Sequence, residues 1–296
     1  MKMVKKKTAD IAIVGVVTAI LLLGIIVAVI SLVQTVYVPK IMEQREADHM
    51  DQVAEQFSYL TSVIDGQAAD RTQNIPIATS ITLGNKELPY LLSVRSFGTL
   101  EILQNTYTIS VSNSSSSGGD VTSIFRIGTI MYSSSNAYFL DQFYIYEAGA
   151  MIVGQSQGNL MMIRPGFFVV YDQVHNSLNI SFDVINISSI GQKTIAAGFG
   201  TYPIQTEFRD LSAHRNFSLV QNMTITTKYS NAWSIFINRS LINSGLNSEG
   251  YGTQFLLSDS GHGVKVDFSS ALSPPVVNLF VRIIDIQAQI GPGWIE

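Results

Sequence analysis

No cysteine occurs among the 296 residues of this chain. The absence excludes disulfide bonds, a cysteine nucleophile and a zinc site built from thiolates. Histidine is scarce too, and the four that occur are scattered without metal-ligand spacing. The sequence also lacks a P-loop and a glycine-rich dinucleotide fingerprint. It therefore predicts neither a metal nor a cofactor.

Charged residues are few beyond position 71, where 25 occur in 225 positions. From residue 39 onward the chain has 14 basic and 21 acidic residues, a net charge of −7. Serine, threonine, asparagine and glutamine supply most of the polarity instead. An acidic chain of this kind lacks the electrostatic footprint of a nucleic-acid-binding protein, so no nucleic-acid partner is expected.

One long apolar segment dominates the N-terminal part of the sequence. Ile11–Val38 is a run of 28 residues without a charged side chain, and lysines precede it at positions 2, 5, 6 and 7. About 20 apolar residues cross a bilayer as a helix, and flanking lysines favour the cytoplasmic side. We therefore expect residues 1–10 to be cytoplasmic, residues 11–38 to form a single transmembrane helix, and the remainder to lie outside the cell.

A cleaved secretory signal is the alternative for this segment. The apolar region of such a signal has about 7–15 residues and ends in a small-residue cleavage site. The segment is nearly twice that length, and its exit reads Tyr37-Val38-Pro39-Lys40. We therefore expect the mature protein to keep it. Since exported eukaryotic domains of this size usually carry disulfides, the absence of cysteine then favours a prokaryotic surface protein.

The part predicted to be exported contains six sequons for N-glycosylation, which suit a surface glycoprotein. The acceptor asparagines are Asn113, Asn179, Asn186, Asn216, Asn222 and Asn238.

Helical periodicity continues beyond Pro39, where the missing amide donor predicts a kink. Over residues 39–71, apolar side chains recur at alternating steps of three and four, which places them on one helix face. They are Met50, Val53, Phe57, Leu60 and Ile64. Gly66 is the expected C-cap. The stripe has two interpretations, packing against the outer domain or helix–helix assembly between copies.

Residues 72–296 change to a period of two, which predicts a single β-rich head. The expected strands are Ile75–Leu83, Leu88–Val94, Thr99–Val111, Ser123–Tyr132, Gln142–Val153, Asn159–Ile163, Phe167–Tyr171, Leu178–Ile187, Thr194–Ala197, Phe217–Lys228, Thr253–Leu257, Val264–Phe268 and Val276–Ile290. One helix interrupts them, capped by Ser230 and ended by Gly245. The predicted fold class is α+β: a long transmembrane and stalk helix, then an antiparallel, sandwich-like head with one short helix.

Gly154–Gly158 matches the Gly-x-Ser-x-Gly nucleophile pattern, with Asp259 and His262 downstream in hydrolase order. That chemistry needs a strand-to-helix turn that exposes Ser156. Strand-like runs flank the motif on both sides, so a β-hairpin explains the same residues. A serine hydrolase is therefore the weakest of the functions considered.

Other polar residues in the head give no catalytic pattern. Asp141, Glu147, Asp172 and Asp183 fall in or beside strands, at spacings that match neither a calcium loop nor a carboxylate pair. Aromatic residues gather over 138–146 and are typical of core or cross-strand packing, less often of a carbohydrate platform. The sequence predicts no catalytic residue.

Two stretches resemble known families. The lysine run, Thr8-Ala9-Asp10, the apolar helix and its amphipathic continuation resemble archaeal type IV pilin-like proteins, whose apolar helix is kept after the lysines are trimmed. Gln142-Phe143-Tyr144-Ile145-Tyr146-Glu147-Ala148-Gly149-Ala150 is similar to a Gln-x-Tyr-x-Tyr-Glu-x-Gly-Ala motif of an uncharacterised archaeal family of single-span surface proteins. Ser96–Leu100 and the helix around Trp233 fit that family too. Lys7 and Asp10 match the pilin processing pattern only in part, so an uncleaved anchor stays open.

These observations favour a non-enzymatic archaeal cell-surface protein with its N-terminus inside the cell, acting as a pilin-like structural or adhesion component. Its expected partners are the lipid bilayer and, through the N-terminal helix, other copies or surface subunits. The alternative is a membrane-tethered extracellular binding module that does not polymerise.

Overall fold

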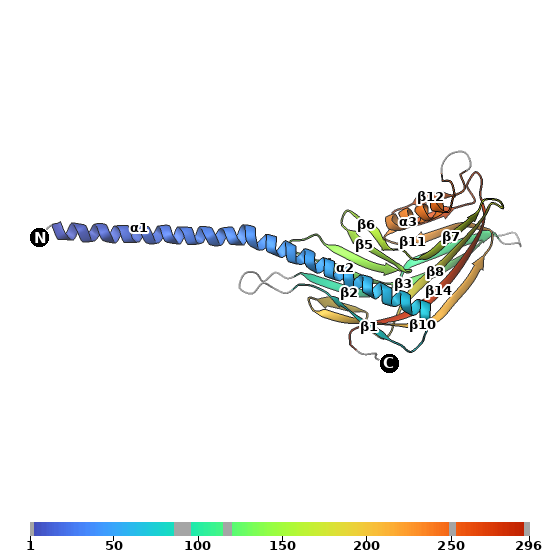
Figure 1. Ribbon diagram of the computed structural model, residues 1–296, viewed down its shortest axis with the longest axis horizontal. Helices are drawn as coiled ribbons and strands as arrows, with labels where there is room; N and C mark the ends of the chain where they lie inside the picture. Colours follow the sequence, from blue (N-terminus) through green and yellow to red (C-terminus); the bar gives the residue numbers. More distant parts are fainter. Residues whose placement is uncertain (1–2, 86–95, 115–119, 249–252, 293–296) are drawn as a thin grey trace.

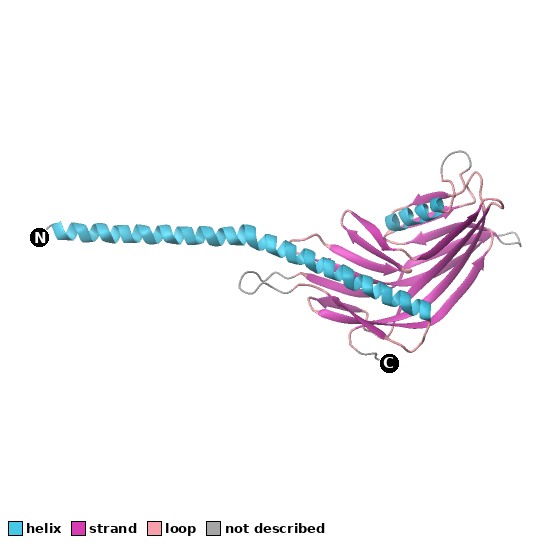
Figure 2. Cartoon of the chain, in the orientation of Figure 1, coloured by secondary structure: helices cyan, strands magenta, loops and turns pink. Residues whose placement is uncertain are grey.

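A long helix projects from a β-rich head in the computed structural model, which describes residues 3–85, 96–114, 120–248 and 253–292 (Figures 1 and 2). The α+β class predicted from the sequence is confirmed. The predicted strand Leu88–Val94 lies outside the described residues.

The long helix consists of α1 (Met3–Leu32), a π-helical turn (Val33–Tyr37) and α2 (Val38–Asp70). It bends between α1 and α2 (Figure 1). Pro39 lies in the first turn of α2, and the wider π turn before it relieves the clash between the proline ring and the preceding carbonyl. The predicted kink is thus present. The predicted C-cap at Gly66 is wrong, because the helix continues to Asp70 and ends where Arg71 adopts a left-handed conformation with φ of 54°.

The strands of the head form two sheets. The five-stranded sheet has the order β1-β10-β14-β8-β7, and the other has the order β12-β13-β11-β2-β3-β4-β5-β6, with β9 paired to β2. Pairing is antiparallel, as predicted, except between β8 and β14, which are parallel. The bounds are β1 Ile77–Thr82, β2 Phe97–Ser114, β3 Asp120–Ser135, β4 Gln142–Glu147, β5 Ala150–Gln155, β6 Gly158–Ile163, β7 Gly166–Asp172, β8 Ser177–Ser189, β9 Ile195–Gly198, β10 Thr201–Phe217, β11 Val220–Thr226, β12 Leu256–Asp259, β13 Gly263–Asp267 and β14 Val276–Ile290.

Two hydrophobic cores lie between the sheets, and each contains one helix. The α3 core is centred on Trp233 of α3 (Ser230–Asn243), and the α2 core contains the apolar face of α2. Long strands contribute to both; on β14, Ile283 belongs to the α3 core and Ile284 to the α2 core. Residues 39–71 and 72–296 therefore share a core, which buries apolar surface that neither could bury alone.

The predicted strands place Thr253–Leu257 three residues too early relative to β12, and they miss one hairpin and one whole strand. Gln142–Val153 is two strands, because Ala148 and Gly149 form a turn with φ values of 53° and 89°. This is the left-handed geometry of a tight hairpin, which glycine adopts without strain. The long strand β10 was not expected at all, and its partner β14 pairs with it from Ile204 to Phe217.

The sheets approach each other most closely where β3 crosses β8. A Cβ added to Gly128 would lie 2.0 Å from the carbonyl oxygen of Ile187. The Gly128 amide donates to Asn186 Oδ1 at 2.8 Å, and Asn186 Nδ2 donates to Asp285 Oδ1 at 2.6 Å. Asn186 therefore links the two sheets.

Gly128→Ala is expected to lower the free energy of unfolding by about 2 kcal/mol, because the methyl group forces β3 away from β8. Gly66→Ala is the matched control, since nothing lies within 4 Å of its added Cβ. In the exposed interior of α2, that change should stabilise the protein by about 0.5–1 kcal/mol. Equilibrium denaturation of both variants measures the difference, and equal effects would contradict the close crossing.

Candidate functional site

The most specific polar contacts in the head lie where α2 enters it. Glu46 is completely buried, and its carboxylate accepts hydrogen bonds from three consecutive backbone amides in the β3–β4 loop. Ala137 N lies 3.1 Å from Oε1, and Tyr138 N and Phe139 N lie 2.8 and 2.7 Å from Oε2. Successive amides around a carboxylate form an anion-binding nest. The head thereby holds the helix within ten residues of the apolar segment.

Further polar contacts follow along the same helix. His49 Nε2 lies 2.9 Å from the carbonyl oxygen of Thr82, and Gln56 binds both the amide and the hydroxyl of Thr82. Gln67 donates to the carbonyl oxygen of Thr206 at 2.7 Å. Desolvation by burial lowers the pKa of His49 below its usual value, against smaller opposing effects of the Thr82 carbonyl and the Glu46 charge. The docked helix therefore favours neutral His49.

The apolar stripe on α2 packs into the head itself. All five side chains have exposed fractions of 1% or less and belong to the α2 core: Met50, Val53, Phe57, Leu60 and Ile64. Of the two interpretations of this stripe, the structure shows packing against the outer domain. Helix–helix assembly through these five residues would require them to leave the α2 core, and it stays a prediction.

A second buried carboxylate belongs to the sequence motif over residues 142–150. Glu147 at the end of β4 is 1% exposed, and it accepts hydrogen bonds from Trp233 Nε1 at 2.5 Å and from the Thr227 hydroxyl at 3.0 Å. Burial raises the pKa of Glu147 to about 7, although both hydrogen bonds oppose the rise. Because it joins the β4–β5 hairpin to β11 and α3, we assign Glu147 a structural role.

The serine of the Gly-x-Ser-x-Gly pattern lies in a hairpin turn. Gln155 pairs with Gly158 where β5 meets β6, and Ser156 is exposed at the tip. Asp259 accepts a hydrogen bond from the Gly261 amide within the β12–β13 turn, at the opposite end of the sheet order. The strand–turn–strand geometry is that of the hairpin interpretation, and it does not provide a nucleophile elbow.

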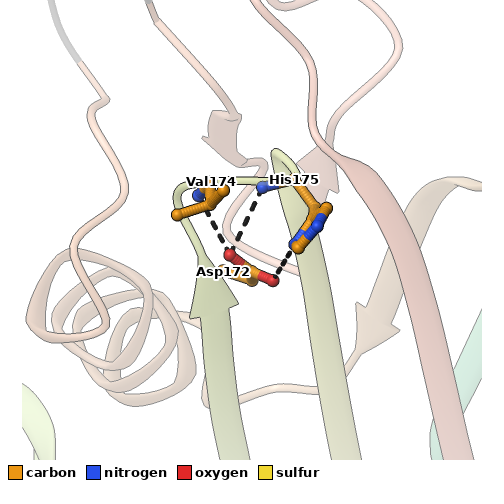
Figure 3. Close-up of polar contacts among 3 residues, drawn as sticks. All are labelled: Asp172, Val174 and His175. Carbon is orange, nitrogen blue, oxygen red and sulfur yellow. Dashed lines mark hydrogen bonds and ion pairs between the residues drawn. The ribbon is translucent and has the colours of Figure 1, made fainter.

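The other acidic residues have local roles. Asp172 closes the β7–β8 turn by accepting hydrogen bonds from the amides of Val174 and His175 and from His175 Nδ1 (Figure 3). The His175 side-chain hydrogen bond is the largest cause of the lowered pKa of Asp172. Asp183 forms an ion pair with Arg282. Within the described part of the chain, no group of three or more histidine, aspartate or glutamate residues has metal-binding geometry.

The six predicted glycosylation sites differ in accessibility. Asn179 and Asn216 are exposed and line one shallow groove on the five-stranded sheet. Asn113, Asn222 and Asn238 are half-buried. Asn186 is half-buried too, and its amide nitrogen, the atom that carries a glycan, already donates to Asp285. Asn186 is thus the acceptor least suited to modification, while use of the other five stays a prediction.

Comparison with protein families gives one match, which starts inside the apolar helix. A model for a family of unknown function, DUF7289, matches residues 12–251. The chain belongs to the DUF7289 family. The match covers most of the apolar helix, α2 and most of the head, so the family model includes both the helix and the head. No curated protein and no solved structure matches the chain. The family assignment names no function, and an archaeal origin and a pilin relationship stay hypotheses.

Proposed function

We propose that this DUF7289 protein is a non-enzymatic, membrane-anchored protein of the cell surface, whose anchor helix continues into the core of its head. The described residues contain one helix long and apolar enough to span a membrane. Almost all side chains from Val14 to Tyr37 are exposed, a segment of about 36 Å at about 1.5 Å per residue. An apolar surface of this size requires lipid or a lipid-like environment.

The observation that carries the proposal is the absence of a linker between this segment and the head. α2 begins directly after the π turn, and Val38 and Met42 are already buried. The Glu46 nest and the Thr82 contacts then hold the helix on both sides. A head mounted in this way keeps a fixed orientation relative to the membrane, which suits a structural or adhesive component. The N-terminal lysines favour an outward-facing head.

We expect the full-length protein to remain in membranes after alkaline carbonate extraction. A Leu22→Arg/Ile26→Arg double variant should be released, because each arginine costs about 2.5–3.5 kcal/mol in the bilayer centre. Ile242→Arg is the matched control: it changes an exposed apolar side chain on α3 and should leave the protein in the membrane. Release of the wild-type protein from membranes by carbonate would contradict membrane anchoring.

A more specific form of this proposal is that the protein polymerises into a pilin-like filament. The buried stripe on α2 then limits which helix surfaces could join the subunits. Since the stripe on α2 is buried, subunits would have to associate through α1, whose side chains from Val14 onward are uncovered. Mechanical shearing of cells is the test. Recovery of the protein in sheared filaments would support polymerisation, and recovery in membranes alone would favour the non-polymerising alternative.

A further inference from the structure

Two neighbouring grooves on the head share one arginine. The first lies between β6 and α3 and is lined by Met161, Phe236, Arg164 and Arg239. The second has a volume of about 540 Å³ and lies where α2 ends, between Arg71, Arg164 and Arg282. Arg164, in the short β6–β7 connection, lines both. Together the two grooves are lined by four arginines.

Three of these four arginines have no partner among the described residues. The side chains of Arg71, Arg164 and Arg239 are exposed and form no hydrogen bond or ion pair with any residue in the described ranges. Arg282 is paired with Asp183, which also lines the second groove. Asp183 and Asp65 are the acidic residues that line the second groove. No acidic residue in the described part of the chain lines the first groove. Three unpaired guanidinium groups thus line two grooves that share Arg164, on a chain that is acidic overall, and such groups attract anions.

The lining of the second groove also fits a ring-shaped ligand. Phe168 has an exposed fraction of 64% and presents its ring at the groove wall. Gly149 and Gly166 leave room there, because neither carries a side chain. In the first groove, the amide side chains of Asn159 and Asn243 supply hydrogen-bonding groups. An apolar ring face, carboxylate-binding arginines and polar amides match the apolar faces, carboxylates and hydroxyls of acidic sugars.

We propose that this surface binds an acidic polysaccharide, a chain of carboxylate-bearing sugars that spans both grooves across Arg164. A repeating ligand is favoured over a single small anion, because the four arginines are distributed along two grooves. The guanidinium groups would bind successive carboxylates, with a sugar ring stacked on Phe168. This inference deepens the proposed function, since it gives the ligand class of an adhesive head.

The test uses the full-length protein in lipid nanodiscs and an oligogalacturonate as the probe. We expect Arg164→Gln to weaken binding about tenfold and Arg71→Gln/Arg164→Gln/Arg239→Gln to weaken it more than a hundredfold. Binding by the wild type should also weaken as salt increases. Arg126→Gln is the matched control, an exposed arginine on β3 outside both grooves, and should bind as the wild type does. Thermal unfolding of each variant checks that the head remains folded.

Three results would overturn the inference. The first is that the wild type does not bind the oligogalacturonate. The second is that it binds a neutral oligosaccharide equally well. The third is that Arg126→Gln loses as much affinity as Arg164→Gln. Tighter binding of an oligoglutamate peptide would instead assign the surface to an acidic protein partner and reject the polysaccharide. Carbonate extraction of the same protein tests membrane anchoring separately. If the protein stays in membranes but does not bind the sugar, only polysaccharide binding is rejected. If it binds the sugar but is extracted from membranes, only membrane anchoring is rejected.

Discussion

Replacing Glu147 by alanine is expected to lower the free energy of unfolding by about 4 kcal/mol at pH 5. The change removes the acceptor for Trp233 Nε1 and for the Thr227 hydroxyl, and it leaves a cavity beside a fully buried indole. An unpaired buried polar group costs about 1–3 kcal/mol, and a cavity adds to that. Denaturant unfolding measures the loss, and a loss below about 1 kcal/mol would contradict the structural role of Glu147.

The same residue gives a pH dependence of defined sign. Because the pKa of Glu147 rises from 4.5 to about 7 on folding, the folded state binds more protons between these values. The Glu147 contribution to stability is full below pH 4.5 and is lost as pH rises to about 7, by about 3 kcal/mol in total. The destabilisation by Glu147→Ala should therefore be smaller at pH 8 than at pH 5.

Glu147→Gln is the control for this titration. Glutamine keeps an oxygen that accepts from Trp233 but carries no titratable proton, so the contribution of residue 147 should no longer change with pH. Differences between each variant and the wild type isolate this contribution, because His49 and the other groups titrate in all three proteins. Parallel stability–pH curves for the wild type and Glu147→Gln would show that Glu147 does not titrate in this range.

Glu46→Ala is expected to lower the free energy of unfolding by about 4 kcal/mol. It removes the shared acceptor of three backbone amides that have no other partner in the described structure. Unlike Glu147→Ala, this change acts where the helix enters the head. Amide hydrogen exchange at Ala137–Phe139 should therefore accelerate more than exchange in the α3 core.

Glu43→Ala is the matched control on the same helix, because Glu43 is exposed one turn earlier. It should change stability by less than about 0.5 kcal/mol. Glu46→Gln should lower the free energy of unfolding by an intermediate amount. One side-chain oxygen still accepts hydrogen bonds, but the new NH2 group faces amide donors. Unchanged exchange at Ala137–Phe139 in Glu46→Ala would show that the nest does not hold the helix.

Some features of these sites are visible in the sequence. Glu46 precedes Met50 by four residues and Val53 by seven, so an acid occupies the apolar helix face. Glu147 likewise alternates with Ile145 and Phe143 on one face of β4. An acid at an apolar position signals a buried carboxylate, but the partners of Glu46 lie 91–93 residues away in a loop. The sequence alone therefore does not identify the amides that bind Glu46.

The missed strand β10 illustrates the other limit. Its middle, Arg209–Arg215, is largely exposed and has only two apolar residues, Leu211 and Ala213. This alternation is too short to predict a strand, and two bulges shift its register against β14. What forms the strand is backbone pairing with β14, whose paired residues lie 62 (217 to 279) to 86 (204 to 290) positions away in the chain.

The sequence by itself determined the apolar span, the helix beyond it, the β-rich head and the position of α3, since each depends on local periodicity and composition. Only the tertiary structure decided where the stripe on α2 packs, which amides hold Glu46 and which arginines share a groove. These features arise from contacts between residues far apart in the chain, and the spacing of side chains along one segment does not specify its partner.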